Sequence, residues 1–348
     1  MKPNKLYSSF SQMKGLLYSD WFDAILDGQF KPPIGVGIDI TNRCNLNCEW
    51  CNARDYRDNQ TLPLEHVKQI IDLSEDWGVK TVCYAGGGEP TLHPQFPEIL
   101  EYTCDAGLGT IISTNATMLD KRTIEAIAWN TQICSVSVDA GTAETWRSIK
   151  KRDLFPKVVE GCRNLAAQAQ ESGMDLTYKV LLSDKNQYEL YTACKLAKDI
   201  GFKNFFVRPV ASENITGECR VIDFDTEAVF NQLKQCEALE TGEFGVYSNF
   251  GRVSSTTFQK THKFEKCQAS PLFTVFCADG YCYLCIDYRS REEGRMCKHL
   301  DIMEYWNSPA HHSLIDAVNL GNCPRCAFGN YNEQIEHYAA DTFYRWFL

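Results

Sequence analysis

The chain has 348 residues, of which 44% are hydrophobic, 23% charged and 12% aromatic, a composition that excludes a disordered, collagen-like or coiled-coil protein. Its formal net charge of −10 argues against broad electrostatic binding to nucleic acid or to anionic membranes. Length alone predicts about two domains.

Cysteine is unusually common, with 17 residues spread along the chain. The first residues form no apolar signal segment, and no apolar run is long enough to predict a membrane span. We therefore expect a cytoplasmic protein, in which thiols stay reduced and grouped cysteines bind metal more often than they form disulfides.

Residues 1–33 are interpreted as a lead-in, after which short apolar runs alternate with helical patterns. The predicted strands are 34–40, 79–85, 110–113, 133–138, 176–182 and 205–210. The predicted helices between them are 64–77, 96–106, 121–129, 155–171 and 187–200. Strand–helix units in series require parallel strands and right-handed crossovers. We therefore predict an α/β fold, a partial (β/α)6 barrel over residues 34–254, with the site in the loops after the strands.

The character of the sequence changes after a last helical stretch at 226–239. Seven cysteines lie within residues 255–330 among short aromatic runs and turns, and so short a segment has little core of its own. We predict a small cysteine-rich domain over 255–332, held together by metal, with short helical stretches at 303–306 and 310–318. A C-terminal helix is predicted over 333–348.

Three cysteines directly follow the first predicted strand with the spacing C-x3-C-x2-C: Cys44, Cys48 and Cys51. Three thiolates leave one iron of a [4Fe–4S] cluster without a protein ligand, and an open coordination position distinguishes a reactive metal site from a closed structural one. The alternatives are half of a zinc site or cysteines of a hydrophobic core. Structural zinc sites normally show paired knuckles, and loops after barrel strands carry catalytic groups, so the cluster is favoured.

This motif, with Trp50 at the aromatic position before Cys51, resembles the signature of radical S-adenosylmethionine (SAM) enzymes. The resemblance implies that the open iron binds the amino and carboxylate groups of SAM. It also implies that an electron from the reduced cluster cleaves the sulfonium to give a 5′-deoxyadenosyl radical, which takes a hydrogen atom from the substrate. The cofactor then supplies the radical chemistry, and the protein holds the cofactor, orients the substrate and excludes water.

The resemblance also assigns SAM contacts along the strand ends. The run Gly86-Gly87-Gly88-Glu89 resembles the family's GGEP motif, where glycine permits close backbone approach to a ligand, although an ordinary turn uses glycines too. Thr114 and Ser137 are similar to residues that meet the methionyl carboxylate or the ribose. Lys179 and Arg208 resemble basic residues used against carboxylates, so we assign Lys179 to SAM and Arg208 to catalysis. The alternative for Lys179 is a solvent-facing position on the strand.

Four cysteines of the C-terminal segment have the spacings C-x12-G-x4-C and C-x2-C: Cys267, Cys285, Cys323 and Cys326. A zinc ribbon uses the same ligands, but this spacing resembles the auxiliary-cluster domain called SPASM. Asn332 and Glu336 stand where that domain has two more cysteines. The chain therefore resembles the shortened "twitch" variant with one fully ligated auxiliary [4Fe–4S] cluster, whose expected role is electron transfer or structural support.

Cys277, Cys282 and Cys297 lie nearby and are most simply buried core residues. A more specific hypothesis is that Cys282 returns a hydrogen atom to a substrate radical, as an epimerase requires. The remaining cysteines fall on predicted helices and strands and are interpreted as core: Cys83, Cys104, Cys134, Cys162, Cys194, Cys219 and Cys236.

The leading functional hypothesis is a radical SAM oxidoreductase or epimerase that acts on a sugar-like or aminocyclitol small molecule. Its electron donor would be a flavodoxin or ferredoxin, with no nucleic-acid or membrane partner. A peptide maturase is the second hypothesis, although residues 1–33 are too few for the leader-binding module that many such enzymes carry. The third is a zinc-stabilised binding protein without catalysis. It predicts iron-free protein, whereas two clusters predict about eight iron atoms per chain.

Overall fold

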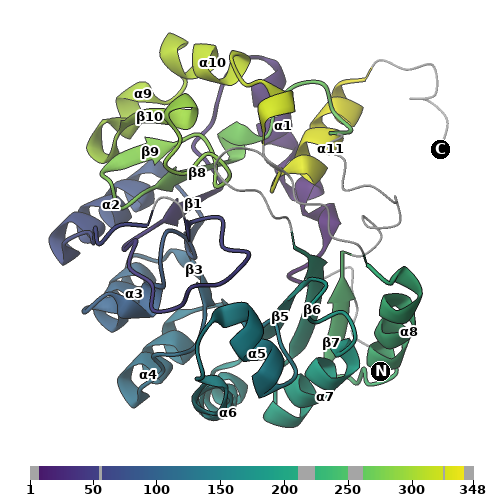
Figure 1. Cartoon of the computed structure of the whole chain (residues 1–348). Coiled ribbons are helices and arrows are strands. Elements are labelled where there is room, and N and C mark those ends of the chain that lie inside the picture. The colour runs from purple at the N-terminus through teal and green to yellow at the C-terminus, as the bar shows by residue number, and fades with distance from the viewer. Residues whose placement is uncertain (1–7, 55–56, 211–223, 250–261, 324–325, 341–348) are drawn as a thin grey trace.

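The computed structural model describes residues 8–54, 57–210, 224–249, 262–323 and 326–340. Its strands form one ten-stranded sheet in the order β10-β9-β8-β1-β2-β3-β4-β5-β6-β7. Neighbouring strands from β1 to β7 pair in parallel. The sheet curves, and helices cover its outer side (Figure 1). The predicted α/β class with a parallel sheet is confirmed.

The parallel strands are β1 (Gly35–Ile38), β2 (Thr81–Tyr84), β3 (Gly109–Thr114), β4 (Ile133–Ser137), β5 (Asp175–Leu182), β6 (Asn204–Pro209) and β7 (Gly245–Ser248). The helices that connect them are α2 (Leu64–Trp77), α3 (Phe96–Asp105), α4 (Lys121–Asn130), α5 (Ala143–Lys150), α6 (Phe155–Ser172), α7 (Leu190–Ile200) and α8 (Thr226–Glu237). The six predicted strands all form, and each crossover helix that was predicted is present. β7 and α5 were not predicted.

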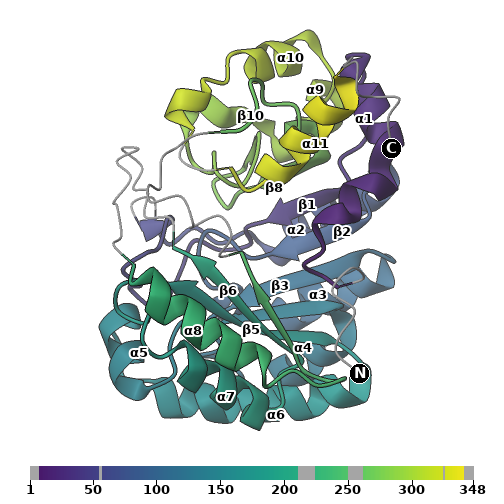
Figure 2. The ribbon, with the colours of Figure 1, turned by 90° about the vertical axis from the view of Figure 1, so that its right-hand side faces the viewer.

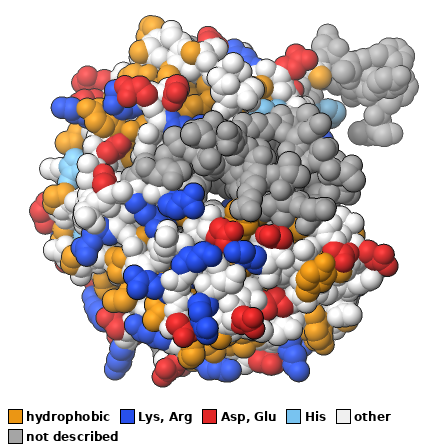
Figure 3. Space-filling view, viewed as in Figure 1, with side chains coloured by type: hydrophobic (Ala, Val, Ile, Leu, Met, Phe, Trp, Pro, Cys, Tyr) orange, Lys and Arg blue, Asp and Glu red, His pale blue; other side chains and the backbone are white. Residues whose placement is uncertain are grey.

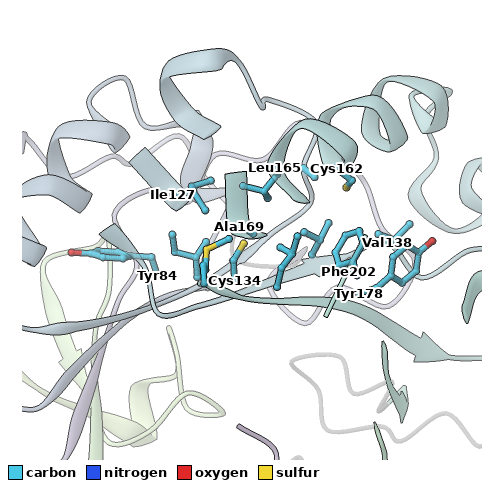
Figure 4. Close-up of a cluster of buried hydrophobic side chains, with 14 of the residues drawn as sticks. Tyr84, Ile127, Cys134, Val138, Cys162, Leu165, Ala169, Tyr178 and Phe202 are labelled. Carbon is cyan, nitrogen blue, oxygen red and sulfur yellow. The ribbon is translucent and has the colours of Figure 1, made fainter. Parts of the chain in front are cut away.

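The two faces of the sheet differ in burial. Along β3, half-buried and buried residues alternate from Gly109 to Thr114, as the period of a strand requires. The buried set packs under the helices, where Cys134 lies beneath Ile127 and Leu165, and Tyr178 lies beside Phe202 (Figure 4). The half-buried set lies on the opposite side of the sheet, which we call the concave face.

The C-terminal segment extends this sheet instead of forming a separate one. β8 (Phe273–Phe276) pairs in parallel with β1, and β9 (Tyr281–Tyr283) and β10 (Arg295–Lys298) continue in antiparallel order. β8 thereby covers the edge of β1, which would otherwise expose unpaired backbone groups. The helices of this segment are α9 (Ile302–Tyr305), α10 (Pro309–Asp316) and α11 (Gly329–Ala339). The predicted boundary at 254/255 lies outside the described residues, as do residues 341–348 of the predicted C-terminal helix.

The two ends of the described chain pack together. Within the predicted lead-in, α1 (Ser19–Leu26) lies beside α11 (Figure 2). Phe22 and Ile25 of α1 form a small core with Ala269, Leu272 and Ile335. Among the described residues, the helices are all too short or too polar to cross a membrane.

Candidate functional site

The loop that follows β1, residues 41–51, is the three-cysteine loop. It carries three free, half-buried thiols: Cys44, Cys48 and Cys51. Trp50, the aromatic residue of the motif, is also half-buried. The end of α5 holds this loop in place, because the backbone N–H of Asn47 donates to the carbonyl of Lys150 (3.4 Å) and that of Glu49 donates to the carbonyl of Ile149 (3.1 Å).

The thiols lie in a partly dehydrated environment with two positive charges. The guanidinium of Arg57 donates a hydrogen bond to Sγ of Cys51 at 2.9 Å. Burial raises the pKa of the Cys44 and Cys48 thiols, and the positive charges of Arg57 and Lys150, respectively, oppose that rise. Positive charge near thiols favours the thiolate form, which is the form that binds iron.

The glycine loop, residues 86–89, packs directly against the three-cysteine loop. The backbone N–H of Gly88 donates to the carbonyl of Thr41 and that of Glu89 to the carbonyl of Arg43, both at 2.8 Å. A Cβ atom on Gly88 would lie 1.9 Å from the carbonyl oxygen of Arg43, so only glycine permits this approach. The structure therefore brings the two predicted motifs together.

The side chain of Glu89 points into the fold. Its carboxylate accepts hydrogen bonds from the hydroxyl of Thr91 (2.8 Å), the hydroxyl of Thr114 (2.6 Å) and the backbone N–H of Asn115 (2.7 Å). Burial raises the pKa of Glu89, and these donors oppose the rise by stabilising the charged form. Glu89 and Thr114 were predicted to contact SAM. Their side chains join the glycine loop to the end of β3 through the hydrogen bond between them, and the SAM contacts stay a prediction.

The predicted residues of β4, β5 and β6 share the concave face. Ser137 stands opposite Lys179 in the β4–β5 pairing, and Arg208 stands opposite Leu181 in the β5–β6 pairing. Because side chains alternate along a strand, Ser137, Lys179 and Arg208 lie on the same side of the sheet, and all three are half-buried. The sheet therefore brings a hydroxyl and two basic groups to the edge that also carries the two loops.

A buried ion pair at the end of β1 was not predicted. Nε of Arg289 lies 2.7 Å from Oδ2 of Asp39, and the thiol of Cys277 donates to the same oxygen at 3.6 Å. Oδ1 of Asp39 is buried without a hydrogen-bond partner and faces Gly86. A carboxylate at the end of an otherwise apolar strand was the available sequence signal for Asp39. No local pattern marks Arg289, which the fold brings from the C-terminal segment.

The hydrogen-atom donor predicted at Cys282 is not supported by its location. The Cys282 thiol is completely buried in the hydrophobic core and lies against Cys297 of β10. A substrate radical cannot reach a thiol enclosed in this way. The neighbouring thiol of Cys277 is linked to the glycine loop, because it donates a hydrogen bond to Asp39, which faces Gly86.

The four C-terminal cysteines of the second motif gather from three segments of the chain. Burial raises the pKa of the Cys285 thiol, and the nearby charges of Cys267 and Cys323 raise it further. Burial likewise raises the pKa of Cys326 to about 11, with a contribution from Cys267. Cys267 therefore lies within electrostatic range of both Cys285 and Cys326, and Cys285 also lies within range of Cys323.

Asn332 and Glu336 hold the segment around Cys267. The side-chain oxygen of Asn332 accepts from the backbone N–H groups of Gln268 (2.6 Å) and Ala269 (2.8 Å), and its amide donates to Sγ of Cys326 (3.6 Å). The carboxylate of Glu336 accepts from the backbone N–H groups of residues 265 and 266. These two positions, which bear cysteines in the full SPASM pattern, therefore clamp the loop through hydrogen bonds.

We expect Asn332→Ala to remove iron selectively from the C-terminal cysteines. The substitution leaves two backbone N–H groups beside Cys267 without their partner, each at a cost of about 1–3 kcal/mol. Iron per chain after anaerobic reconstitution should fall from about eight atoms towards about four. Glu333→Ala on the same helix is the control, and equal iron in the two variants would contradict the assigned role.

The chemistry of the donor set fits an iron–sulfur cluster, because thiolates are the ligands that hold such clusters and this loop carries three free thiols. Among the described residues, no three His, Cys, Asp or Glu side chains converge closely enough to hold one metal ion. The glycine backbone packs closely against its surroundings, because an added Cβ atom would lie 2.5 Å from Oδ1 of Asn42 at Gly87 and 1.9 Å from the carbonyl oxygen of Arg43 at Gly88.

A model of the Radical SAM superfamily matches residues 38–181. The antilisterial bacteriocin subtilosin biosynthesis protein AlbA of Bacillus subtilis is 27% identical over 180 residues, which are 51% of this chain and 39% of AlbA. An AdoMet-dependent heme synthase of Methanosarcina barkeri is 28% identical over 197 residues, 55% of each chain. The mycofactocin maturase MftC of Mycobacterium tuberculosis is 31% identical over 171 residues, 49% of this chain and 43% of MftC. The matches thus span only part of the length of these relatives.

The fold is similar to that of solved structures. SuiB of Streptococcus suis bound to S-adenosylmethionine superposes with a TM-score of 0.67 at 15% identity, covering 95% of this chain and 80% of SuiB. The structure of SuiB bound to its precursor peptide SuiA gives a TM-score of 0.65, also at 15% identity, covering 97% of this chain and 81% of SuiB. At this identity the likeness concerns the fold alone.

Proposed function

Because a model of the Radical SAM superfamily matches residues 38–181, we propose that this protein is a radical SAM enzyme that abstracts a hydrogen atom from a peptide substrate. The observation that carries the proposal is the contact between the three-cysteine loop and the glycine loop at the ends of β1 and β2. Cys44, Cys48 and Cys51 would hold a [4Fe–4S] cluster there, and SAM would bind beside it. When bound, these groups supply hydrogen-atom abstraction from an unactivated carbon.

The chain's own residues bind and orient the reactants in this proposal. The backbone of Gly86–Gly88 would bind the amino acid part of SAM, and Glu89 keeps that backbone in place through Thr114. Ser137 and Lys179 offer a hydroxyl and a positive charge to the methionyl carboxylate or the ribose. Arg208, further along the concave face, is assigned to the substrate, where it would orient a carbonyl or carboxylate group.

A peptide substrate is supported by what similar proteins do. AlbA is named as a bacteriocin biosynthesis protein, and MftC is named as a mycofactocin maturase. SuiB has been crystallised with a precursor peptide. The sequence alone favoured a sugar-like or aminocyclitol molecule, in part because residues 1–33 are few. The comparisons support the peptide hypothesis better than that preference, and they give a sugar-like or aminocyclitol substrate no support.

We further propose that Cys267, Cys285, Cys323 and Cys326 hold an auxiliary [4Fe–4S] cluster. Four cysteine ligands would close this cluster to substrate, so it would carry electrons or support the fold. A flavodoxin or ferredoxin is the proposed source of electrons for the first cluster.

The test is a turnover assay with anaerobically reconstituted protein, SAM, a reductant and a short peptide encoded beside the gene. We expect the peptide to change mass and 5′-deoxyadenosine to form only when the peptide is present. The Lys179→Met variant should retain both clusters and lose most of this activity, whereas Lys185→Met, whose charge pairs with Glu49, serves as a control. An unchanged peptide together with 5′-deoxyadenosine formation driven by a small molecule would contradict the peptide assignment.

A further inference from the structure

Two positive charges flank the three-cysteine loop. We infer that Arg57 and Lys150 are positioning residues that raise the reduction potential of the cluster held by Cys44, Cys48 and Cys51. The inference rests on the proposed function only in that this loop holds a cluster. Arg57 donates to a thiol of the loop and the backbone of Lys150 accepts from the loop, so we expect both residues to act on the cluster and not on the substrate.

Lys150 is a buried cation at the end of α5. It is 2% exposed, and its Nζ lies 2.5 Å from Oδ2 of Asp139, which follows β4. Asp139 is itself fixed, because its Oδ1 accepts the backbone N–H of Leu181 at 2.7 Å. Burial lowers the pKa of Lys150, but the charge and hydrogen bond of Asp139, together with the nearby Cys48 and Cys51, outweigh this effect and leave the pKa raised, so the ammonium stays charged.

The backbone of Lys150 is tied to the three-cysteine loop. The carbonyl of Lys150 accepts the N–H of Asn47, and the carbonyl of Ile149 accepts the N–H of Glu49, so the end of α5 contacts the loop on both sides of Cys48. The residue that carries the buried positive charge is therefore joined directly to the loop.

Arg57 approaches the loop independently. One of its nitrogen atoms donates to Sγ of Cys51 at 2.9 Å and another to the carbonyl of Leu46 at 2.6 Å. The guanidinium therefore fixes the loop and places a hydrogen bond on a thiol that would ligate iron. Hydrogen bonds to ligand sulfurs and nearby net charge are the factors by which a protein sets the potential of an iron–sulfur cluster.

The direction of the effect follows from electrostatics. Reduction adds one negative charge to the cluster, and a nearby positive charge stabilises the reduced form more than the oxidised form. The stabilisation is strongest where water is excluded, as at Lys150. Lys151, the next residue, is 45% exposed and pairs with Glu49 beside the same loop. Lys and Arg side chains gather on the surface over α5 (Figure 3), and solvent screens such exposed charges.

The test is the midpoint potential of the full-length protein, measured by paramagnetic resonance on the signal that is absent from the C44A/C48A/C51A variant. Lys150→Met should lower the equilibrium constant for reduction at least tenfold, which is about 59 mV for a one-electron couple. Arg57→Met should also lower the equilibrium constant for reduction. Lys151→Met is the matched control, and its midpoint potential should shift by less than half as much as that of Lys150→Met.

Lys150→Met leaves Asp139 without its partner, so two further variants guard against misfolding. Lys150→Arg keeps the charge and should keep the potential, and Lys150→Met/Asp139→Asn removes both charges and should still lower it. If the cluster signal is intact but the Lys150→Met and Arg57→Met variants have the same potential as the Lys151→Met variant, the inference is wrong. Absence of the signal from the unmodified protein would instead refute the proposed function.

Discussion

Replacing Cys44, Cys48 and Cys51 together by alanine is expected to abolish formation of 5′-deoxyadenosine from SAM and to remove about half of the bound iron. The three thiols lie on one loop, and no other cysteine of the first motif replaces them. They are half-buried, so their loss should lower the free energy of unfolding by only about 1–2 kcal/mol in the iron-free protein. The measurements are product formation by chromatography, iron per chain, and denaturant unfolding.

The control for this variant is Cys104→Ala, which alters a half-buried cysteine of α3 that belongs to neither motif. It should retain the iron content and the reaction of the unmodified protein. If the triple variant still cleaved SAM, or if it lost all of its iron, the assignment of one cluster to each group of cysteines would be wrong.

Gly88→Ala is expected to have the second-largest effect, although it adds only one methyl group. The new Cβ would lie 1.9 Å from the carbonyl oxygen of Arg43 and 2.6 Å from the carbonyl carbon of Asn42. Both are backbone atoms of the three-cysteine loop, so the loop itself must move. Overpacking of this kind costs about 1–3 kcal/mol. We therefore expect a lower unfolding free energy, less iron at the first motif and loss of SAM cleavage.

Gly321→Ala provides the comparison, because its added Cβ would meet only the side-chain oxygen of Asn319, at 3.1 Å. A flexible side chain can move away, so stability should change by less than about 0.5 kcal/mol. Wild-type iron content and SAM cleavage in Gly88→Ala would show that the contact between the two loops is unnecessary.

The strands of the sheet could be predicted because each is a short apolar run followed by a polar loop. α5 was missed because its eight residues include Glu144, Arg147 and Lys150, which hide the apolar stripe of Trp146 and Ile149. β7 has only four residues and no clear apolar run. The pairing of β8 with β1 could not be read from the chain, because it joins residues more than 230 positions apart.

The same distinction holds for the site. The three-cysteine loop and the glycine loop are local patterns, and the sequence alone predicted both and their position after successive strands. The ion pair of Asp39 with Arg289 and the bracketing of Cys48 by the end of α5 depend on contacts between distant segments. Glu89 was assigned to SAM as part of the glycine motif, and a motif does not specify the direction of its side chain. Its four hydrogen-bond donors turn it into the fold.

The most direct measurement is the paramagnetic resonance spectrum of the reduced protein with and without SAM. We predict that SAM changes the signal which the C44A/C48A/C51A variant lacks, since one iron of that cluster has no ligand from the polypeptide. A signal from these cysteines that stays the same at saturating SAM would mean that every iron is already ligated, and it would contradict the proposal that SAM binds to this cluster.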